Sequence, residues 1–230
     1  MTEVLFLLCV VAGTFVQSVT GFAMGMIVMA VCGALALYPL PVVAAVVSII
    51  ALTNFALALP GHLHEVARRH WLASISGQLP GTVLGVLVLD FLSESAVTVL
   101  QLLLGLFIVV GCLSMMVRPQ PLASPSPLRQ TWLAGLAGGI LAGLFAAAGP
   151  VLGWFFYRQP WAVASIRATL MACFATSTVV RTGTVGLTGG LTGEVLVLCA
   201  ISVPAVLVVT LAVRRWPPRL SDEGLKRLAF

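Results

Sequence analysis

Charged residues are scarce in this sequence. Asp, Glu, Lys and Arg make up 8% of its 230 residues and apolar residues 60%, with a mean hydropathy of +1.12. A soluble domain carries about 25% charged residues, so this composition excludes one. Most of the length consists of continuous apolar runs near the roughly 20 residues that a helix needs to cross a bilayer, without the alternation of barrel strands. We therefore expect an all-α, polytopic membrane protein in which residues 1–230 form a single integral membrane domain.

Acidic residues are absent from the interior of every apolar run. The seven in the chain lie at run ends: Glu3, Glu65, Asp90, Glu94, Glu194, Asp222 and Glu223. The pair His62 and His64 could bind a metal ion, but the arginines beside it favour a solvated loop, and the five cysteines form no Cys-x-x-Cys pair. We therefore expect no enzyme activity, no cofactor and no metal, and the net charge of +5 in the loops gives no reason to expect a nucleic-acid partner.

Basic residues collect in three connections between the apolar runs. These are Arg68 with Arg69, the stretch from Arg118 to Arg129, and the tail from Arg214 to Arg227. Because positively charged loops stay in the cytoplasm, we assign these three connections to the cytoplasmic side. The turns at 90–94 and 188–194 carry acids but no base, so we assign them to the outside.

A glycine-containing phrase occurs twice. It reads Ala12-Gly13-Thr14-Phe15 leading to Gly21-Phe22-Ala23-Met24-Gly25, and Ala142-Gly143-Leu144-Phe145 leading to Gly149-Pro150-Val151-Leu152-Gly153. Each copy interrupts a long apolar run. Paired interruptions in corresponding places of two halves indicate a midplane binding site in a secondary transporter.

The charge pattern gives each interrupted run a topology. Both ends of the run 132–157 fall on the cytoplasmic side, and about 26 residues cannot cross twice, since two spans need about 40. We therefore expect a re-entrant hairpin with its tip at Ala148-Gly149-Pro150. The corresponding run 4–38 begins and ends outside, and we expect it to break near Thr20-Gly21.

These hairpins predict two inverted-topology repeats with broken or re-entrant helices. The first repeat covers residues 1–117, a cytoplasmic proline-rich linker covers 118–131, and the second repeat covers 132–230. The first half continues after Glu94 with a full apolar span, whereas the second half stops at Phe230. The sequence therefore predicts that the final helix of the second repeat is missing, through natural shortness, truncation or a lost reading frame.

Two arginines lie inside the apolar run 161–187. Charge at this depth is costly and usually functional. Arg167 and Arg181 are 14 residues apart, which returns to nearly the same helix face, with Thr178 between them. Helix N-termini after the two breaks would add positive potential, so we expect an anion to bind here. The candidate substrate-binding residues are Thr20, Gly21, Asn54, Gly149, Pro150, Arg167, Thr178 and Arg181.

Each candidate also has a structural explanation. The two arginines could extend to the lipid headgroups, as long basic side chains do near helix ends. Asn54 could hydrogen-bond a neighbouring helix without touching substrate, and Gly21-x-x-x-Gly25 and Gly149-x-x-x-Gly153 could serve close packing. These alternatives stay open at the level of the sequence.

The order of motifs resembles one known family. Duplicated A-G-x-F … G-x-x-x-G hairpins, each followed by a long helix and then a helix with a central proline, resemble the TauE/SafE sulfite-exporter family from about residue 4 to about 228. The segment Ala146-Ala147-Ala148-Gly149-Pro150 is poorer in glycine than the usual second hairpin of that family.

This resemblance implies a secondary transporter in the bacterial inner membrane. It would carry small sulfur-containing anions such as sulfite, sulfoacetate or other organosulfonates by alternating access around a central site. Its partners would be the small anionic substrate and the lipid bilayer, and a homodimer could cover the groove left by a missing helix. The alternative hypothesis is a noncatalytic membrane scaffold subunit.

Overall fold

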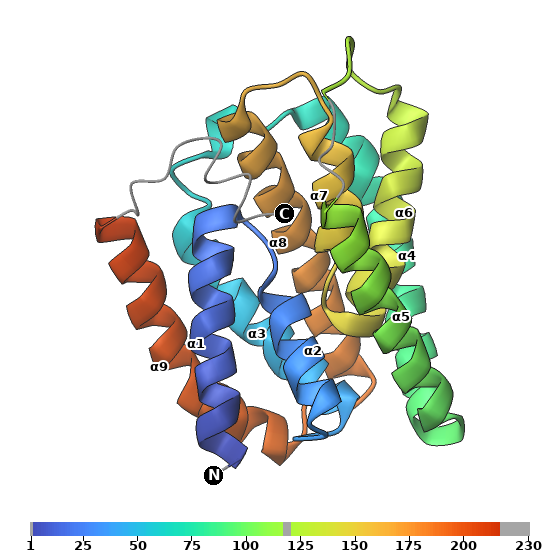
Figure 1. Cartoon of the computed structure of the whole chain (residues 1–230), viewed down its shortest axis with the longest axis vertical. Coiled ribbons are helices and arrows are strands. Elements are labelled where there is room, and N and C mark those ends of the chain that lie inside the picture. The colour runs from blue at the N-terminus through green and yellow to red at the C-terminus, as the bar shows by residue number, and fades with distance from the viewer. Residues whose placement is uncertain (1, 117–120, 217–230) are drawn as a thin grey trace.

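The computed structural model describes residues 2–116 and 121–216. Within these residues every regular element is a helix (Figure 1): α1 Thr2–Thr20, α2 Met24–Ala34, α3 Leu40–Ala58, the 3-10 turn η1 Leu63–Glu65, α4 Arg68–Ser95, α5 Val97–Met116, α6 Leu128–Phe145, α7 Gly149–Tyr157, α8 Val163–Leu187 and α9 Gly193–Arg215. The helices α1, α3, α4, α8 and α9 are long and apolar enough to cross a membrane. The prediction of an all-α, polytopic membrane protein is confirmed.

Both apolar runs that carry the repeated phrase are broken in the structure. The chain leaves α1 at Gly21, whose φ of +89° suits glycine, and α2 starts after Ala23. The second break covers residues 146–148, so the hairpin turns slightly before the predicted tip. Gly149 and Pro150 instead form the first turn of α7, where proline is well placed because that turn needs no intrahelical N–H.

The order of elements is the same in the two halves. A broken pair (α1 with α2, α6 with α7) precedes a long helix (α3, α8) and then a helix with an internal proline, Pro80 in α4 and Pro204 in α9. In Figure 1, α1 runs upward whereas α6 runs downward, and the other corresponding helices also run in opposite directions. The predicted absence of a last helix concerns residues after Trp216, which lie outside the described residues.

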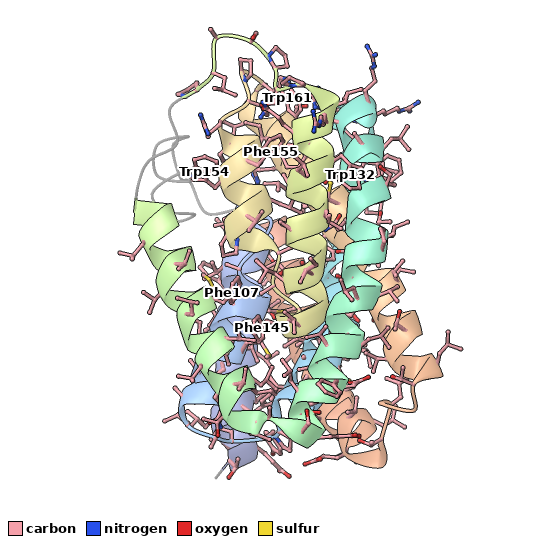
Figure 2. All side chains as sticks on the ribbon, turned by 90° about the vertical axis from the view of Figure 1, so that its right-hand side faces the viewer. Phe107, Trp132, Phe145, Trp154, Phe155 and Trp161 are labelled. Carbon is pink, nitrogen blue, oxygen red and sulfur yellow. The ribbon has the colours of Figure 1, made fainter. Side chains whose placement is uncertain are left out.

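The basic connections lie at one end of the bundle. The starts of α4 and α6 lie at the top of Figure 1, and α9 ends in its upper half, near the level where α1 ends. Figure 2 places Trp132, Trp154 and Trp161 toward this same end, while Phe107 and Phe145 stack at 5.3 Å farther down. Tryptophans gather at both membrane interfaces, so they mark this end as a membrane boundary; its basic residues make it the end that we expect in the cytoplasm.

The helices α4 and α6 pack with their backbones in direct contact. Three glycines on each helix, spaced four residues apart, face the partner: Gly77, Gly81 and Gly85 on α4, and Gly135, Gly139 and Gly143 on α6. A Cβ on Gly81 would lie 2.6 Å from the carbonyl oxygen of Leu136, and one on Gly143 would lie 2.6 Å from the Cα of Gly85. Small residues allow this approach in membranes, and we call the contact the glycine seam.

The corresponding contact on the other side of the bundle joins α9 to α1 and α3. No described glycine lies in this contact: Gly193 is the first residue of α9 with open space around it, and Gly13 of α1 packs on Met24. Side chains therefore separate the two backbones here. We call this contact the α1–α9 seam.

Candidate functional site

A small cavity of about 40 Å³ lies where the two chain breaks meet. Gly25 of α2 packs on the backbone carbonyl of Ala146 in the second break. Phe22 of the first break in turn packs on Gly149 of α7. A Cβ added to Gly149 would lie 2.7 Å from the Phe22 ring. Residues from both breaks therefore share one wall. The polar side chains around the cavity are Gln17, Ser48, Ser177, Thr178 and Arg181.

Two helix N-termini border the central cavity. The bond from Ile27 N to Ala23 O (3.0 Å) starts the hydrogen-bond ladder of α2, and the bond from Leu152 N to Ala148 O (3.1 Å) starts that of α7. The amides before these donors have no carbonyl one turn back, so they carry the positive end of each helix dipole. Since Gly149 and the start of α2 line the cavity, both dipoles raise its potential.

Arg181 is the charged side chain of the central cavity. It is 1% exposed. Its Nε donates to the carbonyl of Gly143 (3.0 Å), and its Nη1 donates to the carbonyl of Ala44 (2.8 Å) and to Ser48 Oγ (2.6 Å). These bonds fix the guanidinium between α3, α6 and α8. Arg181 therefore lies in the protein interior and does not extend to the headgroups.

One edge of the Arg181 guanidinium is left without a partner. Its Nη2 is buried and makes no hydrogen bond. No carboxylate of the described residues lies within ion-pair distance, and Asp90 of α4 acts on Arg181 only from farther away. A buried charge is costly unless it is paired and hydrogen-bonded. The geometry therefore provides an unused positive donor beside a cavity.

The predicted stripe on α8 divides between two cavities. Thr178 and Arg181 border the central cavity together with Phe174, which stacks on Phe55 at 6.4 Å. Arg167 borders a second cavity nearer the end of the bundle that carries the basic connections. The period of the helix places these residues on one face, but that face crosses two separate spaces.

Asn54 joins three helices through its amide. It is fully buried, and its Nδ2 donates to Ser18 Oγ of α1 (2.9 Å) and to Thr210 Oγ1 of α9 (2.8 Å). Its Oδ1 accepts from Gln17 Nε2 (3.1 Å). Both polar atoms of the Asn54 amide therefore make hydrogen bonds to neighbouring helices, as the alternative to substrate contact predicts. Gln17, which borders the central cavity, connects the network to it.

Three other predicted residues lie beside the central cavity and not in its lining. Thr20 Oγ1 lies 2.9 Å from Val16 O and 2.8 Å from Phe22 O, so its hydroxyl stabilises the turn of the first break. Gly21 packs toward Met171 of α8. Pro150 points toward Gly111 of α5. These residues shape the breaks that form the cavity.

A family model described as "Sulfite exporter TauE/SafE" matches residues 5–230. This chain belongs to the TauE/SafE family. A curated relative from Cupriavidus necator, described as "Probable sulfite/organosulfonate exporter TauE", is 47% identical over 219 residues, which cover 95% of this chain and 86% of the relative. No solved structure matches.

Membership in the TauE/SafE family fixes the broad class of activity. The family consists of membrane transporters, so the chain is a multi-pass membrane transporter and not an enzyme. The resemblance found in the sequence is confirmed.

Two site residues were missed in the sequence. Ser48 donates to Ala44 O (2.8 Å) and accepts from Arg181, but one serine in an apolar run gives no signal of a partner on another helix. Phe22 fits between Gly149 and Gly153. Its place in the repeated phrase was visible, but its contact with the second copy depends on the fold.

Proposed function

We propose that this TauE/SafE chain is a secondary permease for sulfite or a small organosulfonate in the bacterial inner membrane. The observation that carries the proposal is the unpartnered Nη2 of buried Arg181 beside the cavity between the breaks. The name of the Cupriavidus relative supports this class of cargo.

The chemistry of the cavity suits a compact oxyanion. Sulfite presents three oxygens, and an arginine edge with helix N-terminal amides supplies directed, positively polarised donors. A cavity of about 40 Å³ has room for about three waters, since one water needs roughly 10–15 Å³. That volume favours an anion with four heavy atoms. An organosulfonate with a carbon chain needs the breaks to move apart.

The arrangement of the helices supports alternating access. Corresponding helices run in opposite directions in Figure 1, as inverted repeats require, and the cavity lies between the two breaks. In such transporters one repeat rocks against the other around a fixed site. The proposed division into residues 1–117 and 132–230 follows from this relation.

Transport by the purified chain in liposomes tests the proposal. We expect sulfite uptake by the wild type and a loss of at least about tenfold for Arg181→Gln, because a charge-assisted hydrogen bond contributes about 1.5–3 kcal/mol. Arg158→Gln is the matched control, since Arg158 lies over the ring of Trp154 (4.3 Å) outside the cavity.

Equal rates for the two variants would remove Arg181 from the site. A wild-type chain that moves neither sulfite nor sulfoacetate, yet co-purifies stoichiometrically with another membrane protein, would favour the scaffold alternative.

A further inference from the structure

A second and larger cavity of about 340 Å³ lies at the cytoplasmic end of the α1–α9 seam. It is bordered by α1, α3, α8 and α9, and it shares no lining residue with the central cavity. We call it the vestibule. We propose that the vestibule is a separate binding site for organosulfonates, one that a substrate occupies before the central cavity. This proposal rests on the proposed anion transport.

Two arginines give the vestibule its charge. Arg167 of α8 is partly buried, and its Nε makes no hydrogen bond. Arg214 of α9 donates from Nη1 to Leu57 O (3.0 Å), which holds the guanidinium at the rim. Glu65 also borders the vestibule, but its carboxylate lies 3.5 Å from His62 Nδ1 and is engaged there. The positive charges of Arg167 and Arg214 outnumber the negative charge of Glu65, so the vestibule is net positive.

Two hydroxyl side chains, Ser18 and Thr210, also line the vestibule. Both accept a hydrogen bond from the Nδ2 of Asn54. In the structure Gln17 donates to the amide oxygen of Asn54, and the amide nitrogen faces the two hydroxyls. The hydroxyl oxygens are therefore engaged as acceptors, and their hydrogens are left to donate elsewhere.

Those hydroxyl hydrogens are not used within the helices. Other buried hydroxyls donate to the carbonyl one turn earlier: Thr14 to Val10 (2.7 Å), Ser48 to Ala44 (2.8 Å) and Thr82 to Gln78 (2.8 Å). Within the described residues neither Ser18 nor Thr210 donates a hydrogen bond of this kind. Two O–H donors and two guanidinium groups that line one cavity form a site for an oxyanion.

The walls of the vestibule fit the rest of an organosulfonate. Val19, Ala168 and Met171 line the vestibule with apolar surface. A volume of about 340 Å³ accommodates several carbon atoms, whereas the central cavity of about 40 Å³ does not. The two cavities therefore differ in ligand: sulfite fits either one, and a longer sulfonate fits the vestibule alone until the Asn54 network opens.

Isothermal titration of the full chain in phosphatidylcholine nanodiscs tests the assignment with two ligands, sulfite and sulfoacetate. We expect Arg167→Gln and the isosteric Thr210→Val each to weaken sulfoacetate binding at least tenfold, and Arg181→Gln to leave it within twofold of wild type. For sulfite, which fits either cavity, we expect Arg181→Gln to remove binding at the central site and to leave binding at the vestibule. Arg158→Gln is the control, and thermal unfolding of each variant shows that it is folded.

Two results would overturn the vestibule site. One is sulfoacetate binding that is insensitive to both Arg167→Gln and Thr210→Val. The other is loss of both ligands in Arg181→Gln alone, which would indicate a single central site. A phospholipid headgroup would offer similar oxyanion chemistry, so competition by added phosphatidylglycerol would assign the site to lipid instead. If Arg181→Gln left sulfite binding unchanged, the proposal of a central site would be wrong, and the proposal of a vestibule site would remain.

Discussion

The two seams that join the halves of this transporter are built differently. In the glycine seam, α4 and α6 touch backbone to backbone, so that a Cβ at Gly139 would lie 2.8 Å from the Cα of Gln78. In the α1–α9 seam, side chains separate the helices, and the Asn54 network and the vestibule occupy the space between them. The backbones touch in the glycine seam, whereas polar side chains and a cavity lie between the helices of the α1–α9 seam.

This difference assigns the seams different parts in transport. Close backbone packing has few alternative arrangements, because sliding it meets steric overlap at once. Hydrogen bonds among Ser18, Asn54 and Thr210 can separate and be replaced by bonds to water or to an anion. We therefore expect the repeats to pivot at the glycine seam and to open along the α1–α9 seam.

The largest effect is expected from filling the glycine seam. Gly139→Val places a branched side chain against the backbone of Gln78, so we expect the stability of the chain to fall by about 3 kcal/mol or more. Gly105→Val on α5 is the matched control, because a Cβ at Gly105 meets nothing within 4 Å. Thermal unfolding in detergent measures both. Equal losses would show that the seam has no special tightness.

A reversible lock on the α1–α9 seam should stop transport in a folded protein. Ser18→Cys with Thr210→Cys, in a chain whose own cysteines are replaced by alanine, places two thiols at positions that both bond Asn54. We expect a short bifunctional thiol reagent to reduce sulfite transport at least tenfold, and a cleavable version to restore it on reduction. Each single-cysteine variant controls for simple modification. Undiminished transport by the linked protein would show that this seam does not open.

A smaller effect is expected from removing the amide between the two cavities. Asn54→Leu leaves Gln17 without its acceptor, so we expect the free energy of unfolding to fall by about 1–3 kcal/mol and sulfite transport to fall several-fold. Thr53→Val is the control, because the hydroxyl of Thr53 bonds only within its own helix, to Ile49 O at 3.3 Å. If both variants behaved alike in chemical denaturation and transport, the Asn54 network would not contribute to separating the two cavities.

The sequence predicts the breaks well and the glycine seam poorly. Gly21 belongs to a phrase that occurs twice, and this recurrence is visible in the sequence. The structure gives Gly21 a φ of +89°, which glycine adopts readily. Gly77, Gly81 and Gly85 have no counterparts on α9, so comparison of the halves does not reveal them. Their partner on α6 is defined by the fold alone.

The candidate site was predictable in kind but not in extent. A buried arginine near two broken helices indicates an anion, and Arg181 is where that reasoning places it. Arg167 shares its helix face but lies 14 residues away, about 21 Å along the axis, which is enough to reach another cavity. Helical periodicity predicts which side of a helix a residue faces, but it does not predict which cavity the residue borders.

Crystallography with selenite tests the central claim most directly. Selenite has the charge and shape of sulfite, and its selenium gives an anomalous signal that locates it. We predict a peak in the central cavity, with an oxygen within hydrogen-bond distance of Arg181 Nη2, and loss of that peak in Arg181→Gln. Peaks confined to the protein surface, or a peak between the breaks that persists in Arg181→Gln, would contradict the account.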